Sequence, residues 1–130
     1  GHGLSYSQFN YSNIRLSSTN IAGDDTITAK VDITNTSKVD GAEVVQLYLH
    51  DVKASVPRPA KELKGFDKLW LKAGETKTAS FTLTQRDLSF WDVNTNNWLA
   101  ESGQFEVMIG ASVADIRLRK TFDYQHKAKP

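Results

Sequence analysis

The chain has 130 residues, enough for one domain with its own core, and its 16 Lys plus Arg nearly balance 15 Asp plus Glu, for a formal net charge of +1. This balance provides no field that would attract nucleic acid or an anionic membrane, and no apolar run approaches the roughly 20 residues of a membrane span. The absence of cysteine excludes a disulfide scaffold and a zinc site of the usual cysteine type. The chain opens on Gly1-His2-Gly3 with neither a methionine nor a signal peptide, so we expect a processed protein or a piece of a longer one.

Apolar and polar residues alternate along most of the chain, which is typical of strands with one buried face. We expect strands, in chain order, near residues 14–16 and over residues 26–35, 42–52, 77–83, 88–93, 105–109 and 116–122. Between them lie turn signals rich in Gly, Asp and Asn, at residues 23–25, 40–41, 73–75, 94–97 and 102–103.

Seven or more short strands at this spacing predict an all-β fold, an antiparallel β-sandwich of the immunoglobulin or fibronectin type III kind. No window of ten residues has a convincing helical period, and we find no internal repeat. We place a single domain over residues 1–124 and expect the lysine-rich residues 125–130 to form a flexible polar tail.

The sequence contains few candidates for chemistry. His2, His50 and His126 lie far apart and lack ligand spacing, so we predict neither a metal site nor a cofactor site. No motif for a nucleophilic serine, a phosphate-binding loop or a zinc protease occurs. The paired carboxylates Asp24 and Asp25 lie in an expected turn, where Asp is favoured for backbone reasons, so we predict no catalytic residue.

Aromatic side chains offer a second possibility, because flat rings stack on sugars. Trp98 follows a polar asparagine-rich turn, and Trp98 and Trp70 are the residues that we consider for a sugar platform. The alternative is that these rings fill the core of the sandwich, as aromatic residues in strands usually do.

Residues 58–66 break the alternating pattern. The segment contains three cations, two prolines occur close together at Pro57 and Pro59, and Gly65 follows. We interpret it as a stiffened loop that either is idle or is kept for a partner.

Four segments carry motifs in a defined order: residues 1–9 are GHGLSYSQF, residues 41–48 are GAEVVQLY, residues 58–66 are RPAKELKGF, and residues 87–92 are DLSFWD, with Trp98 and Gly103 after them. Together these segments resemble the C-terminal fibronectin type III-like domain of glycoside hydrolase family 3, from the first residue to about Phe122.

The resemblance implies that the parent proteins are β-glucosidases, β-xylosidases and related enzymes, which retain anomeric configuration through two carboxylates. In this family the nucleophilic Asp and the acid/base Glu belong to domains that precede the segment seen here, and no residue of this chain matches either motif. The resemblance therefore implies a non-catalytic accessory domain, with the catalytic domains as its intramolecular partner and a secreted or periplasmic location. A module that binds polysaccharide and holds the enzyme on it is the alternative.

In family members this domain packs on the catalytic domains. We therefore predict an interface formed by the entry motif and the 58–66 segment, comprising Gly1, His2, Gly3, Tyr6, Arg58, Pro59, Lys61, Glu62 and Lys64. Arg58 is expected to fork onto a carboxylate or onto carbonyls across that interface, while Leu63 and Phe66 hold the segment to the sandwich beneath. On this hypothesis Arg58→Ala leaves the isolated sandwich folded. The alternative is a solvated loop with ion pairs of its own.

Overall fold

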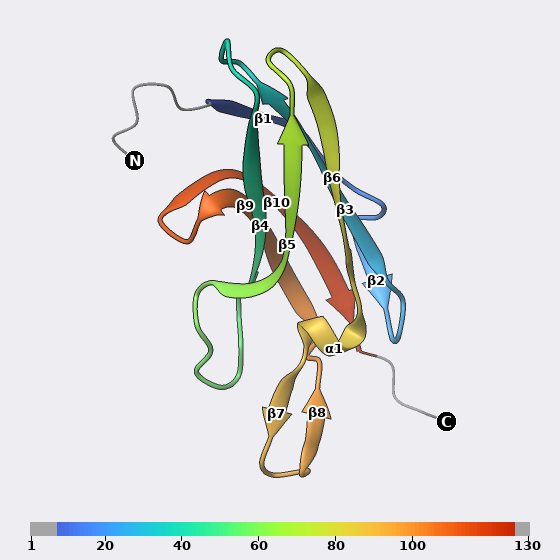
Figure 1. The fold of residues 1–130 in the computed structure, drawn as a ribbon. Coiled ribbons are helices and arrows are strands. Elements are labelled where there is room, and N and C mark those ends of the chain that lie inside the picture. Colours follow the sequence, from blue (N-terminus) through green and yellow to red (C-terminus); the bar gives the residue numbers. More distant parts are fainter. Residues whose placement is uncertain (1–7, 127–130) are drawn as a thin grey trace.

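Two packed β-sheets form the body of the computed structural model, which describes residues 8–126 (Figure 1). The smaller sheet has the strand order β1 (Phe9–Leu16), β3 (Ile27–Asn35) and β6 (Thr76–Leu83). The larger sheet has the order β2 (Asn20–Ala22), β10 (Asp115–Gln125), β9 (Gly103–Ser112), β4 (Gly41–Asp51) and β5 (Glu62–Leu71). All neighbouring strands are antiparallel except β10 and β2, so the predicted all-β antiparallel sandwich is confirmed.

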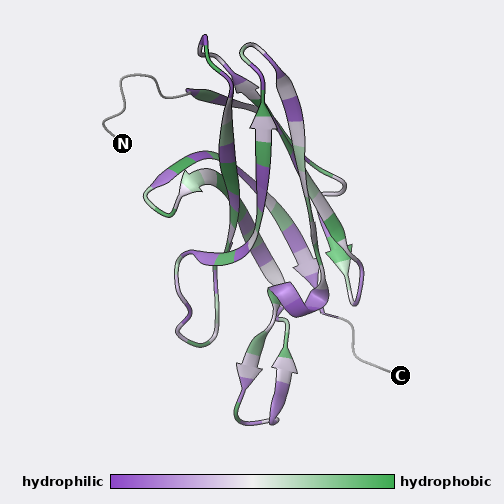
Figure 2. Cartoon of the chain, viewed as in Figure 1, coloured by the Kyte–Doolittle hydropathy of each residue, from purple (hydrophilic) through white to green (hydrophobic). Residues whose placement is uncertain are grey.

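The core lies between the two sheets and is built by the alternation seen in the sequence. Val31 on β3 belongs to the same buried cluster as Leu47 on β4 and Phe105 on β9 of the larger sheet, and all three side chains are fully buried. The alternation is visible along the strands as changing hydropathy (Figure 2). Each large apolar side chain removed from water in this way contributes about 1.5–3 kcal/mol.

A short helix and a small hairpin close one end of the sandwich. Helix α1 (Gln85–Leu88) begins after Thr84, whose backbone N–H and hydroxyl both donate to the Asp87 carboxylate. The prediction of a strand over residues 88–93 is therefore wrong at its start, because a capped helical turn occupies Leu88. Strands β7 (Phe90–Asp92) and β8 (Asn97–Leu99) pair with each other in a separate hairpin that extends beyond α1 (Figure 1).

Strand β5 is the largest departure from the sequence-based expectation, which interpreted residues 58–66 as a loop. Residues from Glu62 onwards pair with β4 in a regular antiparallel ladder, except that Lys64 is an extra residue between Gly65, opposite Leu47, and Leu63, opposite Tyr48. Such a bulge reverses the facing of every residue beyond it. The alternation of buried and exposed residues therefore changes phase at Lys64, so a constant period of two does not predict this strand.

The last strand, β10, runs to Gln125, one residue beyond the boundary of the predicted domain, and residues 127–130 lie outside the described part of the chain. No helix within residues 8–126 has the length and apolar character needed to cross a membrane.

Candidate functional site

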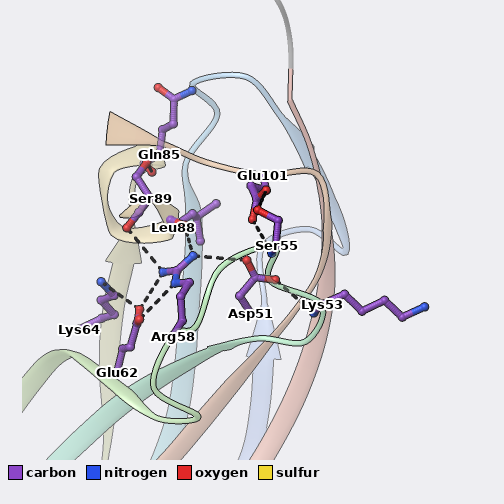
Figure 3. A network of polar contacts seen from close by, with 10 residues as sticks. All are labelled: Asp51, Lys53, Ser55, Arg58, Glu62, Lys64, Gln85, Leu88, Ser89 and Glu101. Atoms are coloured by element: carbon purple, nitrogen blue, oxygen red, sulfur yellow. Dashed lines mark hydrogen bonds and ion pairs between the residues drawn. The ribbon is translucent and has the colours of Figure 1, made fainter. Parts of the chain in front are cut away.

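Arg58 is enclosed by oxygen atoms from three parts of the chain (Figure 3). Its Nη1 donates to Asp51 Oδ2 at 3.3 Å, and its Nε and Nη2 donate to the two carboxylate oxygens of Glu62 at 3.2 and 2.8 Å. The same guanidinium donates to the carbonyl oxygens of Leu88 at 3.2 Å and Ser89 at 3.5 Å. The exposed fraction of the side chain is 5% for Arg58 and 3% for Asp51. We call Asp51, Arg58, Glu62 and these two carbonyls the Arg58 cluster.

The ends of three elements position this cluster. Asp51 is the last residue of β4 and Glu62 is the first of β5, so the intervening loop returns Arg58 to the point where the two strands diverge. Helix α1 ends at Leu88, and the last carbonyls of a helix lack partners within it. The guanidinium supplies donors for these carbonyls, and so ties the 52–61 loop to α1 as well as to the sheet.

The pKa values of the two carboxylates in the cluster shift in opposite directions. Burial raises the pKa of Asp51 above its ordinary value, although the positive charge of Arg58 opposes this effect. Burial also tends to raise the pKa of Glu62, but the hydrogen bonds and charges of Arg58 and Lys64 outweigh it and leave that pKa below its ordinary value. The bidentate pair between Arg58 and Glu62 is thus the stronger of the two ion pairs.

These contacts correct the expectation for Arg58. Its fork is directed at carboxylates and carbonyls of its own chain, and a guanidinium that is almost fully buried cannot reach across an interface at the same time. The reason is the tertiary proximity of Asp51 and α1, which the local sequence of the 58–66 segment does not reveal. From the sequence we expected Arg58→Ala to leave the isolated sandwich folded. These contacts predict instead that Arg58 stabilises the isolated sandwich.

The other residues predicted for the interface fall into two groups. Pro59 is exposed, Lys64 lies 3.6 Å from Glu62 Oε1, and Lys61 donates from Nζ to the Val113 carbonyl oxygen at 2.9 Å. The predicted residues of the entry motif lie outside the described part of the chain, namely Gly1, His2, Gly3 and Tyr6. The interface itself stays a prediction for all of them.

The apolar residues of the same segment point outward. The exposed fractions of Leu63, Phe66 and Trp70 on β5 are 53%, 70% and 57%, and that of Val44 on neighbouring β4 is 37%. The expectation that Leu63 and Phe66 hold the segment to the sandwich is therefore wrong, because the side chains on the core side of β5 are Leu69 and Leu71. We call Val44, Leu63, Phe66 and Trp70 the β5 strip. Phe66, Lys68 and Trp70 lie two positions apart, so this spacing in the sequence predicts that both rings share one face of a strand with an exposed lysine.

The two tryptophans considered for a sugar platform are not brought together. Trp70 belongs to the β5 strip, near the end of β5, whereas Trp98 lies on β8 in the hairpin at the opposite end of the sandwich (Figure 1). Trp98 packs edge-on against Trp91, with ring centroids 5.6 Å apart, and the guanidinium carbon of Arg86 lies 3.7 Å from the Trp98 ring centroid. One face of that ring is therefore covered by a cation.

The two histidines that the structure describes, His50 and His126, belong to no group of possible metal ligands. Within residues 8–126 no group of three or more His, Asp or Glu side chains is close enough to hold a metal ion. His50 lies on β4, His126 follows β10, and His2 is outside the described residues.

A family model, described as the fibronectin type III-like domain, matches residues 43–113. The chain is 45% identical to the thermostable β-glucosidase B of Acetivibrio thermocellus over 93% of its own length and 16% of that protein. It is 47% identical to the periplasmic β-glucosidase of Salmonella typhimurium over 90% of its own length and 15% of that protein.

Solved structures agree with this result. The crystal structure of a Bifidobacterium adolescentis GH3 β-glucosidase superposes with a TM-score of 0.85 at 39% identity, covering 94% of this chain and 18% of that one. The chain thus spans about a sixth of the length of the curated relatives it matches. The resemblance inferred from the four sequence motifs is confirmed.

Proposed function

Because the chain belongs to the fibronectin type III-like domain family and its relatives are family 3 glycosidases, we propose that it is a non-catalytic accessory domain of such an enzyme, a β-glucosidase or β-xylosidase. In this role it packs on the catalytic domains and stabilises them. The observation that carries the proposal is the coverage: the match takes in nearly the whole chain but only about a sixth of each relative.

The Arg58 cluster supports the non-catalytic part of the proposal. A retaining glycosidase needs two carboxylates that flank a sugar, with one carboxyl as proton donor and the other as nucleophile. Asp51 and Glu62 are brought together here, but Asp51 is buried, Glu62 is half-buried, and both bind Arg58. Both carboxylates are thus occupied by a cation of their own chain, and this arrangement fits the closing of the β4–β5 loop rather than proton transfer to a sugar.

Truncation of the whole glycosidase that carries this chain tests the proposal. Removal of residues 1–130 should lower the melting temperature or the soluble yield of the remaining polypeptide, because the surface that this domain covers becomes exposed to water. Unchanged melting temperature, yield and kinetics in the truncated enzyme would refute the accessory role. Hydrolysis of an aryl glycoside by the isolated chain would refute its non-catalytic nature.

The alternative, a module that binds polysaccharide, is tested separately by incubating the isolated chain with insoluble cellulose or xylan. Depletion of micromolar protein from solution would favour it. Since Trp70 and Trp98 lie at opposite ends of the sandwich, a Trp98→Ala variant should then lose depletion while a Trp70→Ala variant keeps it, or the reverse.

A further inference from the structure

The β5 strip is an apolar surface on the side of the larger sheet that faces away from the core. Phe66 and Trp70 are exposed on it and are separated by the exposed Lys68. Val44 lies next to them, opposite Lys68 in the β4–β5 ladder. Exposed aromatic residues that gather on one face, rather than scatter singly, mark interaction surfaces.

Buried apolar residues adjoin the Leu63 end of this strip. Tyr48 pairs with Leu63 on one side and with Met108 of β9 on the other. Both Tyr48 and Met108 are buried, yet neither belongs to the core between the sheets. The strip therefore lies beside a second, smaller apolar layer on the outer face of the sheet.

The charges at the strip indicate which kind of surface fits it. Lys68 lies within the strip and Lys61, which donates to the Val113 carbonyl oxygen, lies near its Leu63 end; neither forms an ion pair with a carboxylate of residues 8–126. A surface with apolar pockets for the two rings and carboxylates for the two cations is complementary. A second copy of this chain, packed face to face on the same strip, would bring Lys68 against a like charge near the two-fold axis.

We propose that the β5 strip is the surface by which this domain docks on the remaining polypeptide of its glycosidase, with Phe66 and Trp70 inserted into an apolar, acidic-rimmed face of the catalytic part. The inference rests on the proposed function and adds to it the residues that make the contact. The relatives leave ample room for such a face, since about five sixths of their length lies outside the match. The Arg58 cluster holds the start of β5 in place, and the strip makes the contact.

Hydroxyl-radical footprinting of the isolated chain and of the whole glycosidase that contains it tests this proposal directly. In the whole enzyme the oxidation rates of Phe66 and Trp70 should fall by roughly tenfold, because side chains at the centre of an interface are excluded from water as in a protein interior. Trp91 on the β7–β8 hairpin is the internal control, and its rate should stay within about twofold.

Equal oxidation rates at Phe66 and Trp70 in the two proteins would overturn the proposal, and so would protection of Trp91 without protection of these residues. Protection that grows with the concentration of the isolated chain would identify a second copy as the occupant and would also overturn it. These results would rule out this face of the domain but would not test the accessory role itself. The accessory role is tested separately by the stability of the truncated enzyme.

A pair of variants gives a second measurement. Phe66→Thr with Trp70→Thr should lower the melting temperature of the whole enzyme by several degrees while changing that of the isolated chain little, because Thr retains the strand preference and removes only the exposed rings. The matched control, Trp91→Thr with Val93→Thr, removes exposed apolar surface from the hairpin and should not lower the melting temperature of the whole enzyme further than that of the isolated chain. An equal effect of both variants on the whole enzyme would contradict the assignment of the face.

Discussion

Arg58 and Phe66 are close in the sequence, yet the charged side chain is buried and the aromatic ring is exposed. In the Arg58 cluster, five hydrogen bonds to oxygens replace the water that the guanidinium leaves behind, so a cation becomes part of the interior. On the β5 strip, apolar side chains lie on the face of a sheet that no other layer of residues 8–126 covers. The contrast shows that a side chain is buried where the fold supplies partners for it. Within this short segment, the polarity of a residue does not predict whether its side chain is buried.

The largest expected effect concerns the buried half of this comparison. Arg58→Ala in the isolated chain should lower the free energy of unfolding by about 3–5 kcal/mol, because it leaves the buried Asp51 carboxylate without a cation and removes the bidentate partner of Glu62. Urea denaturation measures the loss. The control is Arg119→Ala, which removes an exposed partner of Glu106 and should cost less than about 1 kcal/mol. Equal losses in the two variants would show that the cluster contributes no more than a surface ion pair.

A second prediction concerns Gly65, which lies next to the bulge between the cluster and the strip. A Cβ atom at Gly65 would lie 3.2 Å from the Cδ1 atom of Phe81, a buried residue of β6. Gly65→Val should therefore cost about 1–3 kcal/mol through overpacking, as read by the urea midpoint. Ser80→Val, which places the same side chain on the exposed side of β6, should stay within about 0.5 kcal/mol of the parent. A stabilised Gly65→Val variant would mean that the Phe81 ring moves aside easily.

The two carboxylates of the cluster should respond oppositely to acid. The pKa of Glu62 is lowered in the folded state, so its stabilising contribution is complete above the ordinary glutamate pKa and is lost as the pH falls through the folded value. The pKa of Asp51 is raised, so the folded state takes up a proton first and gains stability as the pH falls through that raised value. Stability measured against pH should decline less steeply on the acid side in Glu62→Gln and more steeply in Asp51→Asn.

Surface carboxylates also contribute to the loss of stability in acid. Hydrogen bonds from Asn13 and Thr78 and the charge of Arg15 lower the pKa of Asp32, and Arg117 lowers that of Asp115. Both groups lose stabilisation in acid in every variant, so only the differences from the parent chain report on the cluster. Identical acid limbs in the two cluster variants would contradict the opposite shifts.

The smallest effect is expected at the exposed half of the comparison. Phe66→Thr with Trp70→Thr in the isolated chain should change the free energy of unfolding by no more than about 0.5 kcal/mol per site, because neither ring fills the core. Chemical denaturation of the isolated chain provides the measurement. A loss comparable to that of Arg58→Ala would show that the strip serves the fold itself and not a partner.

The sequence by itself determined the strands that follow a constant period of two, because in such strands each residue's burial depends on its position along one short segment. The alternation in residues 26–35 and 42–52 predicted β3 and β4, and the four ordered motifs together predicted the family. These features are local, or are shared with relatives, and need no knowledge of distant contacts.

Only the tertiary structure decided the roles within residues 58–71. The extra residue Lys64 turns Leu63 and Phe66 to the same face although they lie three positions apart, and Gly65 beside it permits a bulge without fixing the pairing of the strands. Likewise, Arg58 is buried because it donates hydrogen bonds to Asp51 and to the Leu88 carbonyl oxygen at the end of α1. The fold brings these groups close to Arg58 although they lie elsewhere in the sequence. Residues far apart in the sequence supply the partners, and these partners determine that the cation is buried while the aromatic rings face outward.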